Sequence, residues 1–465
     1  MPQATLRVWS EEPCAHAHAA SLRLLAEVGV ELKGEEARAL CATHGARLVG
    51  TRAFFPTAMV DAALASAPRR FTVRPRGAAT APLELAQGAT FFGTGPDCLY
   101  VRDVHSGERR RARLDDVRAA AALAEQLTHL DFVMSMGLPE DAQPATVDLA
   151  QLAVMLGATR KPIVVSSPFG GESLAVMQEM AAAAGERDSL LCLAMSSPPL
   201  QLDPVACDKI VACARLGVPL VLAGSVSAGS GGPASLAACI SVVNAEMLAG
   251  LVLHQLAAPG APFVCGSGVG VLNMRTAIDP YNSPGVFLAN QAQLDLIARY
   301  GLPSWSYAGH SDSKLLDEQW SLELAVSTVL GGLSRATLLH DVGYLESGLQ
   351  SALEGMVLGD ELAGYARALL AELPSADEDF AFDEIAAVGP GGDHLGRRLT
   401  RERHRLFWQP DLIDQASHER WSAAGGRTLL ERVRERVAEL QAADPPFALD
   451  DQVSRALAGL AQGRR

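Results

Sequence analysis

The chain has 465 residues, of which 49% are hydrophobic and 20% are charged, so it can bury a large core and is not disordered. Its 53 acidic and 39 basic residues give a formal charge of −14 at pH 7, which argues against binding of nucleic acid through a basic face. No apolar run approaches the ~20 residues of a membrane span and no signal peptide is recognisable, so we expect a cytoplasmic protein. We expect its eight cysteines, none of them in a CxxC pair, to be buried thiols.

Residues 1–113 are predicted to form an extension of helices and a hairpin that packs on the main domain. Apolar residues have helical spacing from Ser21 to Val30, and a second helix is expected after Phe55-Pro56. The stretch FTVRPRG alternates like a strand. Two short strand candidates flank Gly95-Pro96-Asp97 and predict a hairpin with its turn at these residues.

Residues 114–385 are predicted to form the core of the protein, because short apolar runs alternate there with longer amphipathic helices. Parallel strands that are buried on both faces read as continuous apolar runs. The seven runs are Phe132–Met136, Pro162–Ser166, Leu190–Met195, Pro219–Ala223, Pro262–Cys265, Pro303–Tyr307 and Ala336–Leu339.

A small or polar cluster follows each of these runs, which favours an α/β protein built as a TIM (β/α)8 barrel with its active site at one end. A doubly wound parallel sheet is the alternative. We expect the eighth strand either in Glu384–Val388 or in the N-terminal hairpin.

Residues 386–465 are predicted to form a C-terminal loop followed by helices. The chain has no GxSxG elbow and no GxxxxGK[ST] loop, and the turn Gly266–Gly270 lacks the full dinucleotide-binding spacing. The residues His394, His404 and His418 have no regular metal-ligand spacing, so we expect no bound metal.

The densest group of reactive side chains begins at the end of the run Pro303–Tyr307. On a barrel, Trp305 or Tyr307 would point inward beneath a polar loop, which describes a pocket with aromatic walls. The alternative is a core aromatic residue followed by a helix whose N-cap is Asp312 or Ser313.

Six stretches, taken in order, resemble the trimethylamine methyltransferase superfamily, the corrinoid methyltransferases that demethylate methylated amines and betaines. They are RFTVRPR, FFGTGP, NMRTAIDPYNSP with GLPSW after it, YAGHSDSKLLDEQWSLE, HDVGYLESGL, and GPGGDHL through RHRLFWQPDLID. The resemblance covers most of the chain. It implies a TIM barrel that passes one methyl group from a methylated amine to the cob(I)alamin of a separate corrinoid protein, so that the cobalamin is carried by the partner.

Trimethylamine-specific members of that family carry pyrrolysine, and no such residue is printed in this sequence. The chain therefore resembles the non-pyrrolysine members, for which glycine betaine:corrinoid methyltransferase is the model. A quaternary ammonium leaves as a neutral amine without a general acid, and aromatic faces hold it at ~0.5–2 kcal/mol per contact. The expected aromatic pocket consists of Trp305, Tyr307, Phe92 and Tyr344.

The remaining candidates concern the carboxylate of the substrate and the loop above the pocket. Arg275 would either grip this carboxylate in a bidentate manner or form a surface ion pair. His310 and His340 would add hydrogen bonds to the same carboxylate. We expect His310 and Asp312 to be the catalytic residues. The loop over the substrate is expected to be shaped by Asp312, Lys314, Asp317 and Gln319.

Two departures from the family pattern keep other functions open. Pro284-Gly285 stands where the family has Pro-Glu, and Leu399-Thr400 stands where it has His-Thr. These departures motivate the alternative of a non-catalytic betaine-binding paralogue, and a metal-dependent enzyme on the same barrel is a third reading. The basic strip Arg397–Arg405 is either a solvated surface or a docking surface for the corrinoid protein, and the composition is compatible with a homo-oligomer.

Overall fold

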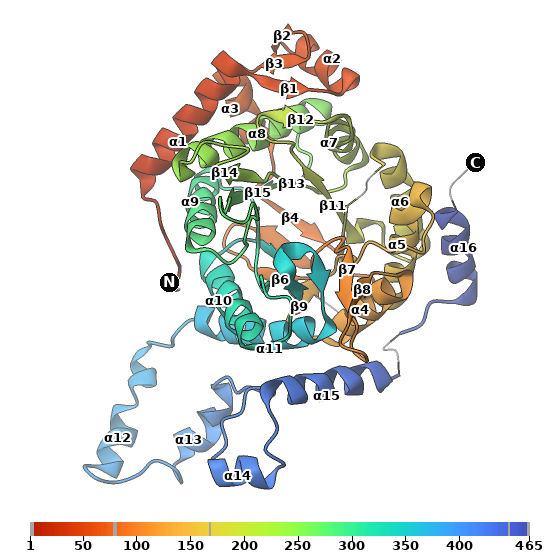
Figure 1. Ribbon diagram of the computed structural model, residues 1–465. Helices are drawn as coiled ribbons and strands as arrows, with labels where there is room; N and C mark the ends of the chain where they lie inside the picture. Colours follow the sequence, from red (N-terminus) through yellow and green to blue (C-terminus); the bar gives the residue numbers. More distant parts are fainter. Residues whose placement is uncertain (1–3, 78–80, 167–168, 445–446, 463–465) are drawn as a thin grey trace.

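The centre of the computed structural model, which describes residues 4–77, 81–166, 169–444 and 447–462, is a ring of eight parallel strands (Figure 1). The strands are β6 (Phe91–Gly93), β9 (Leu130–Phe132), β10 (Ile163–Val165), β11 (Leu190–Met195), β13 (Leu220–Ala223), β15 (Phe263–Gly266), β17 (Ser304–Tyr307) and β18 (Leu338–His340). They are hydrogen-bonded in the order β10-β11-β13-β15-β17-β18-β6-β9. A bridge between Val133 and Ile163 joins the two ends of this order and closes the ring.

One helix follows each strand on the outside of the ring, as in a TIM barrel. These helices are α4 (Leu114–Gln126), α5 (Val147–Ala158), α6 (Gly171–Ala183), α7 (Pro204–Leu216), α8 (Leu236–Ala257), α9 (Pro284–Tyr300), α10 (Glu318–Ser334) and α11 (Leu353–Leu370). Because both faces of the strands are covered, all seven apolar runs of the sequence overlap a barrel strand. The prediction of an α/β barrel is confirmed, and the doubly wound alternative is wrong.

The eighth strand is β6, which lies in the N-terminal part of the chain. It pairs with β18 and with β9, so it is a full member of the ring. The other candidate, Glu384–Val388, lies in helix α12 (Phe382–Val388). Since β6 precedes residue 114, the barrel begins inside the first predicted segment, and the division at 113/114 and 385/386 stays a prediction.

The hairpin expected around Gly95–Asp97 is wrong. The apolar strand β6 finds both of its partners in the ring, and its two faces are covered there. The next strand, β7 (Tyr100–Arg102), pairs instead with β8 (Arg109–Arg111). The arginines of β7 and β8 suit a surface hairpin, whereas the phenylalanines of β6 suit the barrel wall.

A hairpin of β4 (Arg70–Val73) and β5 (Leu83–Ala86) covers the N-terminal end of the barrel. The Arg74 N–H donates to the Asp188 carbonyl at 3.1 Å and the Arg76 N–H to the Arg160 carbonyl at 2.7 Å, and both acceptors precede barrel strands. The apolar side chains of the hairpin continue the core inside the ring. That core cluster comprises Val73, Leu83, Leu85, Phe132, Met134, Val164, Leu191, Leu193, Val221, Ala223, Val264, Trp305 and Leu338.

The N-terminal extension packs on the outer side of α8 (Figure 1). It consists of α1 (Glu11–Arg23), β1 (Val30–Leu32), α2 (Glu35–Thr43), β2 (Arg47–Val49), β3 (Arg52–Phe54) and α3 (Thr57–Ser66). Among the described helices, α8 alone is long and apolar enough to cross a membrane, and 78% of its most apolar stretch is buried inside the protein. Its position between the extension and the barrel accounts for that composition.

The C-terminal segment contacts the barrel at residues 411–413, whose N–H groups donate to Glu361 of α11, and again at its end. Helix α15 (Leu429–Ala442) packs on α11 and α4, and α16 (Asp451–Ala461) packs on α5 and α6. Between α11 and α15, the short helices α12, α13 (Arg398–Arg403) and α14 (His418–Ala423) extend away from the barrel (Figure 1). All eight cysteines are buried, as expected.

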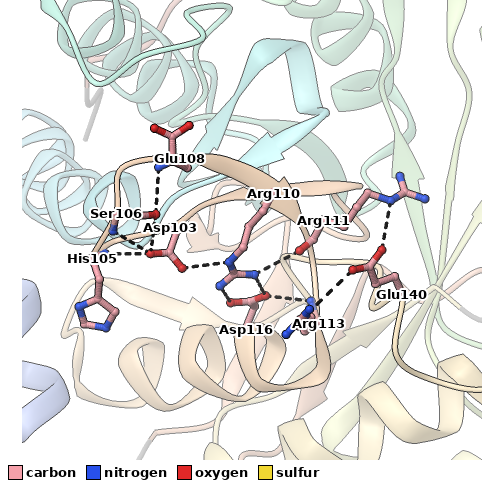
Figure 2. Close-up of polar contacts among 9 residues, drawn as sticks. All are labelled: Asp103, His105, Ser106, Glu108, Arg110, Arg111, Arg113, Asp116 and Glu140. Atoms are coloured by element: carbon pink, nitrogen blue, oxygen red, sulfur yellow. Dashed lines mark hydrogen bonds and ion pairs between the residues drawn. The ribbon is translucent and has the colours of Figure 1, made fainter.

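The surface hairpin β7–β8 is fixed by a network of charged side chains (Figure 2). Arg110 donates to Asp103 at 2.9 Å and to both carboxylate oxygens of Asp116 at 2.7 and 2.8 Å. Hydrogen bonds from the Ser106 N–H and from Arg110 lower the pKa of Asp103 to about 2. Because Asp116 lies in the first turn of α4, the network ties the hairpin to the first barrel helix.

We predict that Leu85→Ala lowers the free energy of unfolding by roughly 2–4 kcal/mol, because it leaves a cavity where the hairpin enters the barrel core. Chemical denaturation followed by circular dichroism measures the change. The matched control is Glu84→Ala, whose side chain on the same strand is exposed and bonds only Thr72, and which should cost less than about 1 kcal/mol. Equal effects of the two substitutions would show that the hairpin does not belong to the core.

Candidate functional site

A cavity of about 310 Å³ lies at the C-terminal end of the barrel strands, opposite the β4–β5 hairpin. It is the end at which TIM barrels carry their active sites. Its lining consists of Pro96, Ser166, Leu193, Met195, Ala223, Gly224, Ser225, Ser267, Gly268, Val269, Gly270, Asp279, Pro280, Tyr281, Val286, Trp305, Tyr307, His340, Asp341, Tyr344 and Gly348. Met195 is 43% exposed, so the cavity has an open apolar rim.

Aromatic rings form one wall of the cavity. Trp305 and Tyr307 alternate with serines along β17, so both point into the barrel. Trp305 stacks on His340, with ring centroids 4.3 Å apart and an angle of 19° between the planes. Tyr307 stacks on Tyr281 at 6.1 Å and meets His340 edge-on at 6.4 Å. The wall is therefore continuous from the barrel core to the loop that carries Tyr281.

The phenol groups of this wall are held neutral. Asn290 donates to the hydroxyl oxygen of Tyr307, and the Tyr344 hydroxyl donates to the Pro96 carbonyl. Burial raises the pKa of Tyr281, Tyr307 and Tyr344 above the usual value of a tyrosine. These rings therefore present uncharged faces to a ligand.

Two carboxylates give the cavity a negative charge. Asp341 is buried, follows β18 with a φ of +78°, and has its Oδ1 2.5 Å from His340 Nδ1. Asp279 accepts a hydrogen bond of 2.5 Å from the Ser227 hydroxyl. Within the described part of the chain, no lysine or arginine lines the cavity. Aromatic faces and carboxylates without a lysine or arginine suit an organic cation.

Four of the predicted site residues, Trp305, Tyr307, His340 and Tyr344, line the cavity together. Phe92 does not, because it is fully buried on the outer side of β6, where its ring lies 5.7 Å from the Arg367 guanidinium. The adjoining Phe91 packs against the interior cluster instead.

The predicted residues of the loop over the substrate lie outside the cavity. Asp317 is the N-cap of α10 and accepts from the Trp320 N–H at 3.0 Å, so the expectation of an N-cap at Asp312 or Ser313 is wrong. The other two side chains bond their own surroundings: Lys314 donates to the Asp312 carbonyl at 2.7 Å, and Gln319 donates to Glu323 at 3.0 Å.

Arg275 lies on the exposed loop between β16 (Val269–Val271) and α9, four residues before Asp279 of the cavity lining. Its guanidinium has no ion pair or hydrogen bond to the described residues. The surface ion pair considered for it is therefore not formed among the described residues, and Arg275 does not line the cavity.

His310 and Asp312 lie behind the aromatic wall and do not line the cavity. His310 has no exposed surface, touches Tyr307 and Tyr281 edge-on at 5.2 and 5.6 Å, and has its pKa lowered by burial. The Asp312 carboxylate accepts the Tyr281 and Asn282 N–H groups at 2.8 and 2.9 Å and the Ser347 hydroxyl at 2.7 Å. The geometry favours a positioning role for both, and their catalytic assignment stays a prediction.

Sequence reasoning missed Tyr281, Asp279 and Asp341 as members of the cavity lining. Asp279 and Tyr281 occur in NMRTAIDPYNSP, and Asp341 occurs in HDVGY, so the residues were inside stretches already singled out. It also missed Glu246 of α8, which anchors the loop after β11 by accepting from the Ser196 hydroxyl and the Leu200 N–H, both at 2.5 Å. Burial raises the pKa of Glu246 to about 7.

No group of three or more histidine, cysteine, aspartate or glutamate side chains among the described residues could hold a metal ion. The described part of the chain therefore contains no candidate metal centre.

The sequence matches the model of the trimethylamine methyltransferase family (MTTB) over residues 2–465. It is 30% identical to a glycine betaine methyltransferase of Desulfitobacterium hafniense (strain Y51), over 97% of this chain and 95% of that protein. It is 27% identical to the trimethylamine methyltransferase MttB of Methanosarcina thermophila, over 94% of this chain and 92% of that protein.

Among solved structures, the fold is similar to the monomethylamine methyltransferase MtmB of Methanosarcina barkeri. The TM-score is 0.54 at 10% identity, over 92% of this chain and 87% of that chain. A hydroxylamine complex of MtmB gives a TM-score of 0.55 at 11% identity, over 98% of this chain and 89% of that chain. At this identity the likeness concerns the fold.

We predict that Asp312→Ala releases the loop that carries Tyr281, because two backbone N–H groups lose a charged acceptor. Hydrogen exchange at Tyr281 and Asn282 should become at least about tenfold faster, as expected for the loss of ~1.5–3 kcal/mol of hydrogen bonding. Ser321→Ala is the control, since the Ser321 hydroxyl donates to the Glu318 carbonyl within α10 and has no contact with Asp312 or Tyr281. Unchanged exchange at Tyr281 in Asp312→Ala would show that the carboxylate does not hold this loop.

Proposed function

Because the chain belongs to the trimethylamine methyltransferase (MTTB) family, we propose that it moves a methyl group from a quaternary amine, such as glycine betaine, to the cob(I)alamin of a separate corrinoid protein in the cytoplasm. The protein is a methyltransferase, and the family works with corrinoid proteins. The observation that carries the choice of a quaternary amine is the cavity itself. It combines four aromatic rings with two carboxylates and one histidine, and none of its described lining residues is a lysine or an arginine.

The cavity can hold an ammonium group that carries no proton. Such a cation cannot donate a hydrogen bond, so its affinity comes from aromatic faces and from nearby negative charge. Trp305, Tyr307 and Tyr281 offer the faces, and the Asp341 carboxylate offers the charge. The neutral phenols do not oppose the cation, and the carboxylates favour it over an uncharged molecule of the same shape.

The same residues fit the chemistry of methyl transfer. When the C–N bond of a quaternary ammonium breaks, its electron pair stays on nitrogen, which leaves as a neutral tertiary amine without taking up a proton. The reduced corrinoid of the partner supplies the nucleophile. The open rim beside Met195 gives the second reactant access. A cavity that holds the substrate in a fixed orientation lowers the activation free energy by several kcal/mol.

For a zwitterionic methyl donor such as glycine betaine, we propose that the Arg275 guanidinium binds the carboxylate of the donor. Its loop leads directly into Asp279 and Tyr281, and its guanidinium is not engaged by the described residues. A bidentate contact at the rim would leave the ammonium end among the aromatic rings.

Neither of the two departures from the family pattern lines the cavity, although Gly285 directly precedes Val286, which does. Gly285 is in the first turn of α9, where an added Cβ would come 3.2 Å from Val271, and it does not line the cavity. Leu399 is in α13, among the short helices that extend away from the barrel. Neither position gives a reason to prefer the non-catalytic binding protein, and no observation favours the metal-dependent enzyme.

The decisive experiment is methyl transfer to chemically reduced free cob(I)alamin, followed by its visible spectrum. The donors are glycine betaine, carnitine, γ-butyrobetaine, proline betaine, choline and trimethylamine. Methylation with a quaternary donor and none with trimethylamine would support the proposal. If transfer is also absent with a cognate corrinoid protein while glycine betaine binds, the protein is a binding paralogue and the proposal falls.

We predict that Tyr307→Leu weakens binding of the active quaternary amine by about 3–30-fold, because one aromatic face contributes ~0.5–2 kcal/mol. Isothermal titration calorimetry measures the dissociation constant. Tyr307→Phe keeps the face and should change it less than about threefold. An aromatic residue outside the cavity, Tyr365, provides the control Tyr365→Leu. If Tyr307→Leu binds as the unaltered protein does, the aromatic wall does not hold the ligand.

We predict that Asp341→Asn lowers the preference of the cavity for a cation over an uncharged group of the same shape. Asparagine also tolerates positive φ, so the backbone should be preserved, while loss of the carboxylate should weaken glycine betaine by roughly tenfold. The uncharged-carbon isostere 3,3-dimethylbutyrate should bind the variant at least as well as it binds the unaltered protein. An equal loss for both ligands would mean that Asp341 only shapes the cavity.

A further inference from the structure

The Asp341 carboxylate, which lines the cavity, accepts no hydrogen bond from the described residues. Asp341 is 3% exposed, and its nearest polar contact joins its Oδ1 to His340 Nδ1 at 2.5 Å. The two atoms are not oriented for a hydrogen bond, and neither has another hydrogen-bond partner in the described chain. A buried acceptor without a donor is unfavourable, so Asp341 points to a donor group that the folded chain does not supply.

Four other carboxylates near this end of the barrel all have donors. Asp279 accepts from a serine hydroxyl at 2.5 Å, Asp312 from two backbone N–H groups and a hydroxyl, and Asp97 from a hydroxyl at 2.8 Å and an amide at 2.9 Å. Glu246 accepts from a hydroxyl and a backbone N–H. The missing donor is therefore a property of Asp341 and not of this end of the barrel.

The backbone around Asp341 is fixed, so its side chain is not free to turn towards a partner elsewhere. The N–H groups of Val342 and Gly343 donate to carbonyl groups of neighbouring segments at 3.2 and 2.9 Å, and the His340 carbonyl accepts an N–H at 2.8 Å. Asp341 itself has a φ of +78°. Residues held in this left-handed region by their surroundings cluster at ligand sites.

A quaternary ammonium has no N–H to offer this carboxylate, but the product of its demethylation has one. When the C–N bond breaks, the electron pair stays on nitrogen and the methyl group passes to the corrinoid. The neutral tertiary amine then takes a proton from solvent at the open rim, since aliphatic amines are protonated at pH 7. The resulting tertiary ammonium keeps the charge of the methyl donor and carries an N–H in place of one methyl group.

We propose that Asp341 accepts a hydrogen bond from this N–H, so that the cavity binds the tertiary ammonium product at least as tightly as the quaternary donor. The inference rests on the proposed methyl transfer. The aromatic faces of Trp305 and Tyr307 meet the remaining methyl groups in either ligand. The added hydrogen bond joins two charged groups, and the methyl donor does not make it. The product therefore competes with the next donor molecule for the cavity.

Isothermal titration calorimetry with glycine betaine and its demethylation product dimethylglycine tests the inference. We expect the dissociation constant of dimethylglycine to be no higher than that of glycine betaine. Asp341→Gly removes the acceptor, and glycine adopts a φ of +78° without strain. This variant should weaken dimethylglycine at least about fivefold more than glycine betaine, because only dimethylglycine loses a hydrogen bond to a charged group.

The matched control is Asp279→Asn, which changes the other carboxylate of the cavity lining. Asp279 already has a donor in Ser227, so its loss should weaken the two cations equally, within about twofold. Melting temperatures near that of the unaltered protein would show that both variants remain folded. Product inhibition needs no variant: dimethylglycine should compete with glycine betaine, with an inhibition constant no higher than the dissociation constant of glycine betaine.

Nuclear magnetic resonance of bound ¹⁵N-dimethylglycine identifies the contact directly. Its ammonium proton should exchange slowly with water in the unaltered protein and fast in Asp341→Gly. Weaker binding of dimethylglycine than of glycine betaine, or an equal loss of both in Asp341→Gly, would overturn the inference and leave the proposed methyl transfer intact. If choline loses more affinity than dimethylglycine in this variant, Asp341 binds a donor hydroxyl and the inference also falls. Absence of methyl transfer from every quaternary amine, with dimethylglycine still held by Asp341, would overturn the proposed function alone.

Discussion

The interior of a closed eight-stranded barrel must be filled with side chains, and the rest of this structure depends on where that filling stops. At the N-terminal end the β4–β5 hairpin adds three apolar side chains to the core. At the other end the core stops at Trp305, which is 1% exposed and belongs both to the core cluster and to the cavity lining. The residue that ends the core therefore also begins the site, and packing in the barrel fixes the orientation of its ring.

Two loops complete the site, and each is fixed by a carboxylate that lies outside the cavity. Asp312 fixes the loop of Tyr281, and Glu246 fixes the loop after β11. Neither carboxylate touches the cavity, so the charges that a ligand meets come from Asp279 and Asp341 alone among the described carboxylates. The proposed methyl transfer from a quaternary nitrogen would need orientation and desolvation more than proton transfer, and a cavity of neutral aromatic faces suits both needs.

The barrel was predictable from sequence because strands covered on both faces leave continuous apolar runs, and all seven such runs proved to overlap barrel strands. Strand β6 was one of two alternatives for the eighth strand, and the sequence did not decide between them because β6 has three residues and its partner β18 lies far away in sequence. The shortness of β6 also explains why Phe92 was wrongly expected in the pocket. A shift of one residue in strand register decides which phenylalanine of FFG faces the barrel interior, and the observed register places Phe91 inside. Trp305 and Tyr307 were found because they share one face of a strand, whereas Tyr281 and Asp341 depend on loop conformations that no periodicity encodes.

Ring closure through β6 also has a consequence for biosynthesis. The strand pairs with β18, whose residues are added about 250 positions later along the chain. At typical synthesis rates of roughly 5–20 residues per second, one edge of β6 stays unpaired for about 12–50 seconds on the ribosome. An apolar Phe-Phe edge is a site for wrong strand pairing during that interval, so production of this protein should depend on chaperones more strongly than its folded stability alone would suggest.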